Sequence, residues 1–77
     1  MPGHERLTMR EHQVLKLLSQ GDALKEVAWG LGISESSVNV HVGHLYDKLQ
    51  VNNKVSAVML GLHLGLIPLP TLQEIRR

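Results

Sequence analysis

The side chains best suited to contact a ligand lie between residues 36 and 49, directly after Ser34, a residue that favours the start of a helix. Apolar residues recur there at intervals of four, three and four, which predicts a helix with one apolar stripe: Val38, Val42, Leu45 and Leu49. A rotation of about 100° per residue places another set on or near the opposite side: Ser36, Asn39, Val40, Gly43, His44 and Asp47. The apolar stripe must face a core, so the second set is the one that a ligand would meet.

Patterns for catalysis and metal binding are absent from the sequence. No nucleophile elbow, glycine-rich phosphate loop or suitably spaced pair of carboxylates occurs. His41 and His44 are three residues apart on the predicted helix, but no Cys, Asp or Glu is spaced to complete a closed metal site with them. We therefore expect neither an enzyme nor a site for a metal or another cofactor.

The composition limits which partners the chain can bind. Its 77 residues suffice for one small domain, and eight Lys and Arg against seven Asp and Glu give a formal net charge of only +1. This charge is far from the strongly basic balance that is typical of nucleic-acid binders. One Trp, one Tyr and no Phe leave no aromatic platform for stacking single-stranded bases, so a nucleic-acid partner should be duplex DNA.

Cysteine usage and hydropathy indicate the cellular compartment. The chain has no Cys, and its N-terminus, MPGHERLT, lacks the basic-then-apolar pattern of a signal peptide. The longest apolar run, 55–70, contains His63 and two glycines and is shorter than the roughly 20 residues that cross a bilayer. These features predict a cytoplasmic protein without a membrane partner.

Helix signals divide the chain into four pieces and predict an all-α fold. Thr8 and Glu11 form a capping box before a helix over 9–20, and Asp22 is the expected cap of a second helix over 23–31. Ser34 begins the third helix, and Asn53 begins a fourth that is expected to continue to about residue 66, before two prolines. Two helices joined by a short turn with glycine outline a helix-turn-helix within a four-helix bundle.

Four segments together resemble the LuxR/FixJ (GerE-type) DNA-binding domain: LTMREHQVLKLLSQG, KEVAWGLGIS, SSVNVHVGHLYDKLQV and NNKVSAV, in this order. The resemblance covers residues 7 to about 59 and implies a transcription factor whose third helix enters the major groove and whose fourth can dimerise. It implies that Asn39, Val40 and Gly43 approach base edges, and we add His44 to the DNA-contacting set because it shares their side of the helix. It also implies phosphate contacts at four positions: Lys25, Ser36, Ser37 and Lys54.

The sequence departs from the common family pattern at three positions of the third helix. Position 39 is often Lys in the family and is Asn here, and position 43 is often Lys, Arg or Ser and is Gly here. Position 47 is often Lys or Arg and is Asp here. All three changes remove positive charge from the expected DNA-facing side.

The fourth predicted helix has two apolar or small-residue sides, which one helix of a small domain cannot bury alone. We expect the side with Val55, Val58, Met59, Leu62 and Leu66 to face the core. The other side would then form a two-fold dimer interface through Ala57, Leu60, Gly61 and Leu64, with the small residues allowing close approach. The alternative is packing of this side against the 67–77 segment or against another domain of a longer chain.

Trp29 falls beside the apolar stripe of the second helix. We expect a partly exposed side chain packed on a neighbouring helix or on the C-terminal tail. The alternative is a contact for another protein domain.

These observations predict three segments: a linker or flexible N-terminus over 1–6, a LuxR-type helix-turn-helix domain over 7–67 and a tail over 68–77. The expected function is sequence-specific binding of duplex DNA by a homodimer that regulates transcription, within a chain that can carry a regulatory receiver or sensor domain. The alternative is a module of the same shape that binds DNA weakly or not at all and works by dimerising or by contacting another protein.

Overall fold

Four α-helices make up the fold of residues 6–69, the part of the 77-residue chain that the computed structural model describes. They are α1 (Met9–Ser19), α2 (Leu24–Leu31), α3 (Glu35–Leu49) and α4 (Lys54–His63). No strand occurs between residues 6 and 69. The predicted all-α fold is confirmed, and the predicted tail and N-terminal segments fall largely outside the described residues.

Three of the predicted caps form the hydrogen bonds expected of them. The Thr8 hydroxyl accepts from the Glu11 N–H at 3.1 Å, and the Glu11 carboxylate accepts from the Thr8 N–H at 2.8 Å. The Ser34 hydroxyl accepts from the Ser37 N–H at 3.1 Å, and the Asn53 side chain accepts from the Ser56 N–H at 2.9 Å. Each cap therefore satisfies an N–H that has no partner within its helix.

Asp22 does not cap α2, which corrects the prediction for this helix. The N-cap residue is Ala23, whose N–H donates to the Glu26 carboxylate at 2.8 Å. Asp22 instead belongs to the turn that ends α1, where its N–H donates to the Leu17 carbonyl at 3.2 Å and its side chain is buried. Asp22 therefore lies one residue before the N-cap position of α2, and its carboxylate does not cap this helix.

The last helix ends about one turn before the predicted end at residue 66. Gly65 adopts a positive φ of 74°, and the Leu66 N–H donates to the Gly61 carbonyl at 2.8 Å. This pattern closes the helix with a left-handed residue, which glycine adopts without a steric penalty. Glycine therefore stops α4 before Pro68 is reached.

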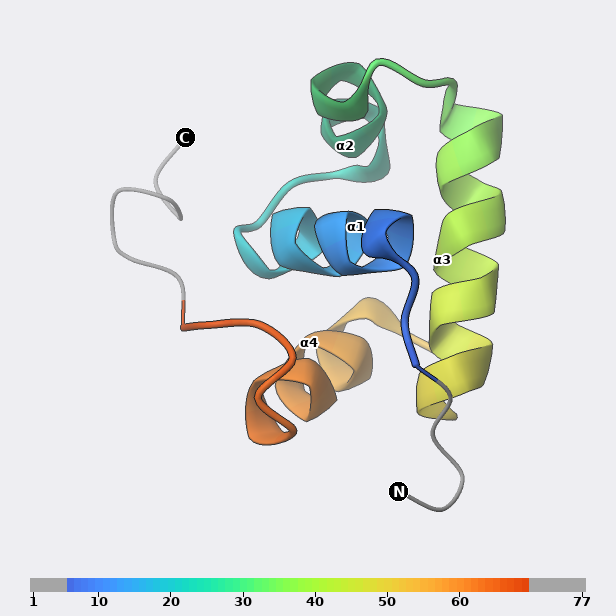
Figure 1. The fold of residues 1–77 in the computed structure, drawn as a ribbon. Helices are drawn as coiled ribbons and strands as arrows, with labels where there is room; N and C mark the ends of the chain where they lie inside the picture. The colour runs from blue at the N-terminus through green and yellow to red at the C-terminus, as the bar shows by residue number, and fades with distance from the viewer. Residues whose placement is uncertain (1–5, 70–77) are drawn as a thin grey trace.

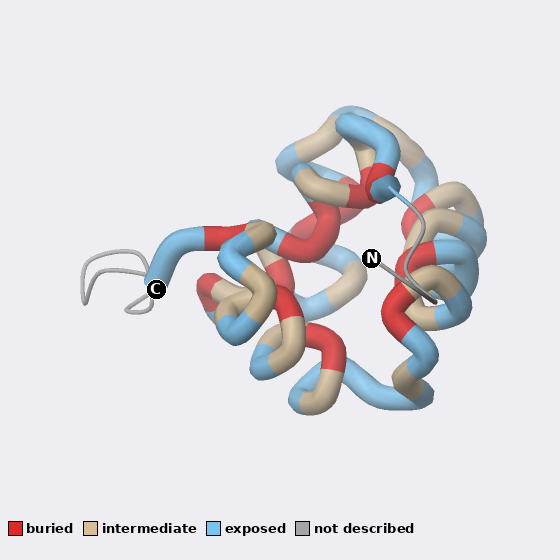
Figure 2. The backbone as a smooth tube through the Cα atoms, turned by 60° about the horizontal axis from the view of Figure 1, so that its bottom comes forward, coloured by how far each residue is buried: buried red, intermediate tan, exposed pale blue. Residues whose placement is uncertain are grey.

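The helices surround one core, with α3 packed against α1 and α2 and α4 packed against α1 (Figure 1). Buried positions follow the inward sides of the helices in Figure 2. The largest fully buried side chains come from the first three helices: Val14, Leu15, Val27, Val38 and Leu45. A short connection over 32–34 joins α2 to α3, and Gly32 turns the chain there with φ of 69°. The predicted helix-turn-helix is thus present, and α3 lies along one side of the domain.

Among the described residues, no helix has both the length and the apolar character that crossing a bilayer requires.

Candidate nucleic-acid interface

The outer face of α3, which we define as Ser36, Asn39, Val40, Gly43, His44 and Asp47, is exposed along its whole length. The opposite side of the same helix forms part of the core, where Val38 and Leu45 are fully buried and Leu49 is nearly so. Val42 is only half-buried, at the edge of the core. The predicted division of α3 into a core side and an exposed side is therefore present in the structure.

Asn39, Val40 and Gly43 lie close together on this outer face. Val40 is 55% exposed, and no other atom lies within 4 Å of where a Cβ on Gly43 would be. The outer face thus presents an amide, an apolar side chain and bare backbone in succession, and its only formal charge is the carboxylate of Asp47. This surface can form hydrogen bonds and apolar contacts but offers no Lys or Arg to an anion.

The N-terminal end of α3 is partly occupied by its own cap. Ser34 takes the N–H of Ser37, and the two hydroxyls are 3.0 Å apart in a hydrogen bond. A phosphate at this end would therefore meet the backbone N–H groups of Glu35 and Ser36. The exposed carboxylate of Glu35 in the first turn opposes such an anion, a feature that the sequence prediction did not consider.

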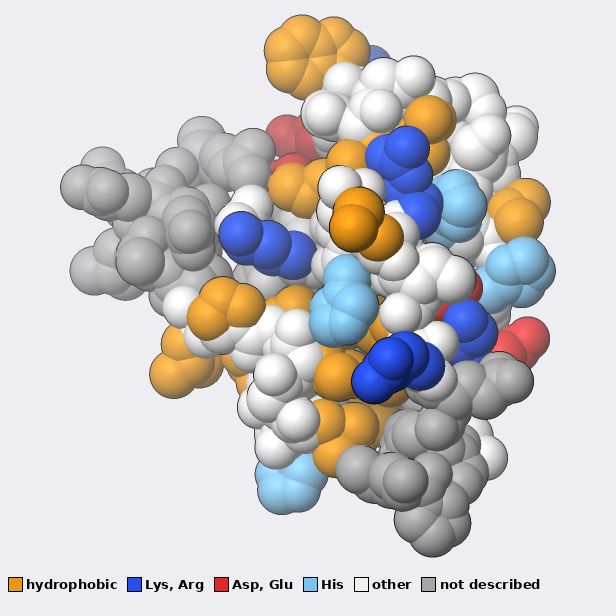
Figure 3. Space-filling view, viewed as in Figure 1, with side chains coloured by type: hydrophobic (Ala, Val, Ile, Leu, Met, Phe, Trp, Pro, Cys, Tyr) orange, Lys and Arg blue, Asp and Glu red, His pale blue; other side chains and the backbone are white. Residues whose placement is uncertain are grey.

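The two lysines predicted to contact phosphates lie outside α3 and differ in their surroundings. Lys25 is exposed on α2. Lys54, the first residue of α4, donates through its ammonium group to the carbonyl of Asp22 at 3.3 Å, so part of its hydrogen-bonding capacity is used within the fold. On the side of the molecule seen in Figure 3, Lys, Arg and His side chains lie dispersed among hydrophobic and neutral ones.

Lys48, the only Lys or Arg within α3, is turned towards α1. Its ammonium group donates to the Glu11 carboxylate at 2.8 Å and to the Arg6 carbonyl at 3.3 Å. The side chains are 19% and 4% exposed for Lys48 and Glu11, so the ion pair is largely shielded from water. The one cation of α3 therefore contributes to the core and not to the outer face.

The surroundings of Glu11 change the pKa of its carboxyl group in opposite directions. Burial alone raises this pKa, but hydrogen bonds from Lys48 and Thr8 and the positive charge of Lys48 outweigh the burial, so the pKa lies below its ordinary value. Glu11 is therefore both a capping residue and a charged partner, and it is ionised at neutral pH.

The structure contradicts part of the predicted division of α4 into a core side and a dimer side. Ala57 is fully buried, and a Cβ on Gly61 would lie 3.0 Å from the Leu15 side chain, so neither residue is available to a second copy. Leu60 and Leu64 are half-buried against the core. On the side expected to face the core, Val55 and Met59 are instead 66% and 65% exposed, whereas Val58, Leu62 and Leu66 are half-buried against the core.

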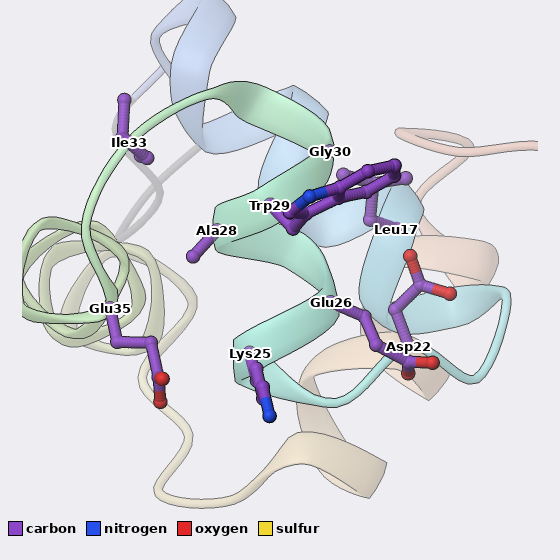
Figure 4. Close-up of a pocket in the computed structure, with 9 residues that line it drawn as sticks. All are labelled: Leu17, Asp22, Lys25, Glu26, Ala28, Trp29, Gly30, Ile33 and Glu35. Carbon is purple, nitrogen blue, oxygen red and sulfur yellow. The ribbon is translucent and has the colours of Figure 1, made fainter.

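Trp29 is 88% exposed, so the expected packing on a neighbouring helix does not occur within residues 6–69. It borders a depression of about 810 Å³ between α2 and the end of α1 (Figure 4). The apolar part of the lining comes from Leu17, Ala28 and Ile33, and Glu26 and Glu35 supply carboxylates. Lys25 also lines the depression, so the indole lies beside an apolar floor with charged residues of both signs around it.

Within the described range, no group of three or more His, Cys, Asp or Glu residues is arranged to hold a metal ion.

Comparison with known proteins identifies the type of domain. The profile of the bacterial regulatory proteins of the luxR family matches residues 5–60, which include all four helices up to the middle of α4. The chain belongs to the luxR family. This assignment agrees with the resemblance of the four sequence segments. The luxR-family helix-turn-helix is a domain of DNA-binding transcription regulators.

Individual luxR-family relatives are similar over the same region. The transcriptional regulatory protein UhpA of Escherichia coli is 51% identical over 49 residues, which are 64% of this chain and 25% of UhpA. The nitrate/nitrite response regulator NarL of Escherichia coli is 43% identical over 54 residues, 70% of this chain and 25% of NarL. The transcriptional activator AnoR of Acinetobacter nosocomialis is 39% identical over 61 residues, 79% of this chain and 26% of AnoR.

The chain thus spans about a quarter of the length of these luxR-family relatives. UhpA and AnoR are named as transcriptional regulators and NarL as a response regulator, and none of the three is named as an enzyme. The luxR-family assignment therefore fixes the class of this domain, a helix-turn-helix of the type found in regulators of transcription.

Proposed function

We propose that the domain over 7–67 binds duplex DNA in the cytoplasm as a two-fold dimer, with α3 in the major groove, and thereby regulates transcription. The observation that carries this proposal is the exposed outer face of α3 above a core-forming side of the same helix. In a helix-turn-helix, residues near the N-terminus of the second helix contact base edges. Asn39, Val40, Gly43 and His44 are our candidates for base contacts.

Phosphate contacts would come from residues around α3. Lys25 is the most accessible cation among the candidates, and Ser36 lies at the helix N-terminus, where backbone N–H groups favour an anion. Lys54 can reach a phosphate if its bond to the Asp22 carbonyl is exchanged, and the Ser37 hydroxyl if its bond to Ser34 is exchanged. These contacts orient the domain on DNA without reading the sequence.

A dimer would form through the exposed side of α4. Val55 and Met59 lie one turn apart and are both largely exposed, so together they form a small exposed apolar patch on α4. Two copies related by a two-fold axis would place two α3 helices on half-sites about one DNA turn apart, or a multiple of it. In a longer chain like those of the relatives, a regulatory receiver or sensor domain would control this step.

The test combines sedimentation with DNA titration. Val55→Asp together with Met59→Asp should shift the protein towards monomer and weaken binding to a two-half-site duplex at least tenfold, because each copy then binds alone. Met9→Asp is the control, since Met9 is 78% exposed on α1 and its change adds a similar charge elsewhere. Unchanged sedimentation of the double variant would contradict the α4 dimer, and no duplex binding by the wild type at low salt would contradict DNA binding.

A second function is favoured by one observation, the 88% exposed indole of Trp29 beside an apolar depression. In this alternative the domain uses the helix-turn-helix shape to contact another protein and binds DNA weakly or not at all. Titration of the wild-type protein with duplexes discriminates the two functions, because sequence-dependent binding is expected only if α3 carries the function. Trp29→Ala should then leave the DNA affinity within about twofold. The alternative requires wild-type protein that binds duplexes weakly and without sequence preference, or not at all.

A further inference from the structure

The fold uses two of the lysines that a charge count would assign to DNA. Lys48 is held by Glu11 at 2.8 Å and by the Arg6 carbonyl at 3.3 Å, and Lys54 is held by the Asp22 carbonyl at 3.3 Å. The outer face of α3 carries no Lys or Arg, and its only formal charge is negative. A surface with this composition gains little from attraction to phosphates.

We propose that the outer face of α3 recognises a half-site that contains an A·T pair, through Asn39 and Val40, with few phosphate contacts and a shallow dependence of affinity on salt. This inference rests on the proposed binding of α3 in the major groove. It adds the kind of base that is read and the type of interaction that supplies the affinity.

Asn39 has the chemistry that adenine requires. Its exposed carboxamide offers one acceptor and one donor side by side, which match the N6 amino group and the N7 atom of adenine in the major groove. Guanine presents two acceptors at the corresponding edge, so an amide cannot pair with both in the same way. Asn39 therefore favours adenine over guanine by one hydrogen bond.

Val40 complements Asn39 with an apolar contact. Its side chain is 55% exposed although it is apolar, and it follows Asn39 directly on the outer face. The C5 methyl group of thymine is the apolar feature of the major-groove edge, and small apolar side chains contact it. Together the two residues match the two partners of an A·T pair, or of neighbouring pairs.

The C-terminal half of the outer face adds no cation to this contact. Gly43 has no side chain, and Asp47, one turn further on, repels a phosphate. Affinity would therefore come from the N-terminal half of α3, from its backbone N–H groups and from the few phosphate contacts outside α3, at Lys25 and, if its bond to Asp22 is exchanged, at Lys54. Each phosphate contact on duplex DNA contributes about 0.9 to the slope of log affinity against log salt, so a small number of contacts gives a shallow slope.

The experiment is selection of duplexes from a randomised pool, followed by titration of the selected duplex and of versions with single base-pair changes. An A·T pair should recur at one position in each half-site. Replacing it with G·C should weaken wild-type binding about 5- to 100-fold, the range for one bidentate contact, and Asn39→Ala should remove most of this difference and leave only the part due to Val40. Lys25→Ala is the control, because loss of a phosphate contact should weaken every duplex alike and preserve the base preference.

The salt dependence is measured on the same selected duplex. The wild-type slope should be shallow, and Asp47→Lys should steepen it by about 0.9 per subunit, because this change places a cation beside the phosphates. Circular dichroism verifies that each variant keeps its helices.

The outcomes separate this inference from the proposed function. Binding that selects G·C at every position, a base preference that Asn39→Ala leaves undiminished, or a steep wild-type slope would overturn the inference while leaving DNA binding intact. Absence of binding to every duplex at low salt would instead overturn the proposed function on which the inference rests.

Discussion

Lys48 shows that the role of a single residue depends on its partner in the fold, which here is Glu11. Its position in the helix that resembles a DNA reader suggests a contact with DNA, but Glu11 binds it from the first turn of α1. The two residues are 37 positions apart in the sequence, so no local pattern predicts the pair. The same glutamate also caps α1, because its carboxylate accepts from the Thr8 N–H as well as from Lys48.

The stability of the domain should depend on acid pH through Glu11. Its pKa is lower in the folded chain than in the unfolded chain, so folding favours the carboxylate, and this contribution is complete above the unfolded value of about 4.3. The contribution should be lost as the pH falls from about 4.3 through the lower folded pKa. Urea unfolding between pH 7 and pH 2 measures this loss.

Glu11→Gln isolates this contribution from those of other carboxylates. At pH 7 the variant should be less stable by about 1–2 kcal/mol, because it loses charge-assisted hydrogen bonds, and the difference from wild type should shrink at low pH. Lys48→Met is the matched variant, since it keeps the length of the stem and removes only the cation. A stability difference that stays constant down to pH 2 in both variants would exclude Glu11 as the source.

Among the elements, α4 shows where sequence patterns fail. Both of its sides are apolar or small, so periodicity alone does not decide which side faces the core. The decision comes from shape: α1 approaches closely at Gly61, where Leu15 leaves no room for a larger residue, and this contact turns Val55 and Met59 outward. The helix limits that depend on local caps were predictable, as at Thr8.

Gly61→Val tests this close approach. A side chain at Gly61 would meet Leu15 at 3.0 Å and Ile67 at 3.4 Å, so the larger residue should destabilise the domain by about 1–3 kcal/mol despite the better helix propensity of valine. Gly43→Val is the control, because it makes the same change in a helix where nothing lies within 4 Å. Urea unfolding gives both values, and equal stability of the two variants would show that Gly61 is not crowded.

The candidate site was predicted in part because it consists of one helix face. Asn39, Val40 and Gly43 follow from periodicity within α3, which places them together without any tertiary information. The use of Lys48 and Lys54 inside the fold could not be predicted, because it depends on contacts between helices that are distant in sequence. Exposure of Trp29 was underestimated for the same reason.

For the molecule as a whole, one small core must supply nearly all of the stability. A domain of 77 residues is expected to have a free energy of unfolding of about 4–12 kcal/mol. The described residues contain no cysteine, so no disulfide adds to this value. The fully buried side chains that connect the helices are therefore difficult to replace.

Leu45→Ala should reveal this dependence. Leu45 is fully buried. Truncating its side chain should lower the free energy of unfolding by about 2–5 kcal/mol, a large part of the stability of the domain. Val40→Ala is the control on the same helix, where 55% exposure predicts a change below about 0.5 kcal/mol. Thermal unfolding followed by circular dichroism compares them, and similar melting temperatures for the two variants would contradict the assigned core.

The position of Trp29 also has a spectroscopic consequence. Because it is the only tryptophan and is 88% exposed in the folded domain, its fluorescence comes from an indole that is already surrounded by water. Unfolding changes those surroundings little, so the emission is a poor measure of folding. Any molecule that covers the outer side of α2 would remove that water and change the fluorescence emission of Trp29. Because unfolding changes the same emission little, the signal would report binding at α2 and not folding.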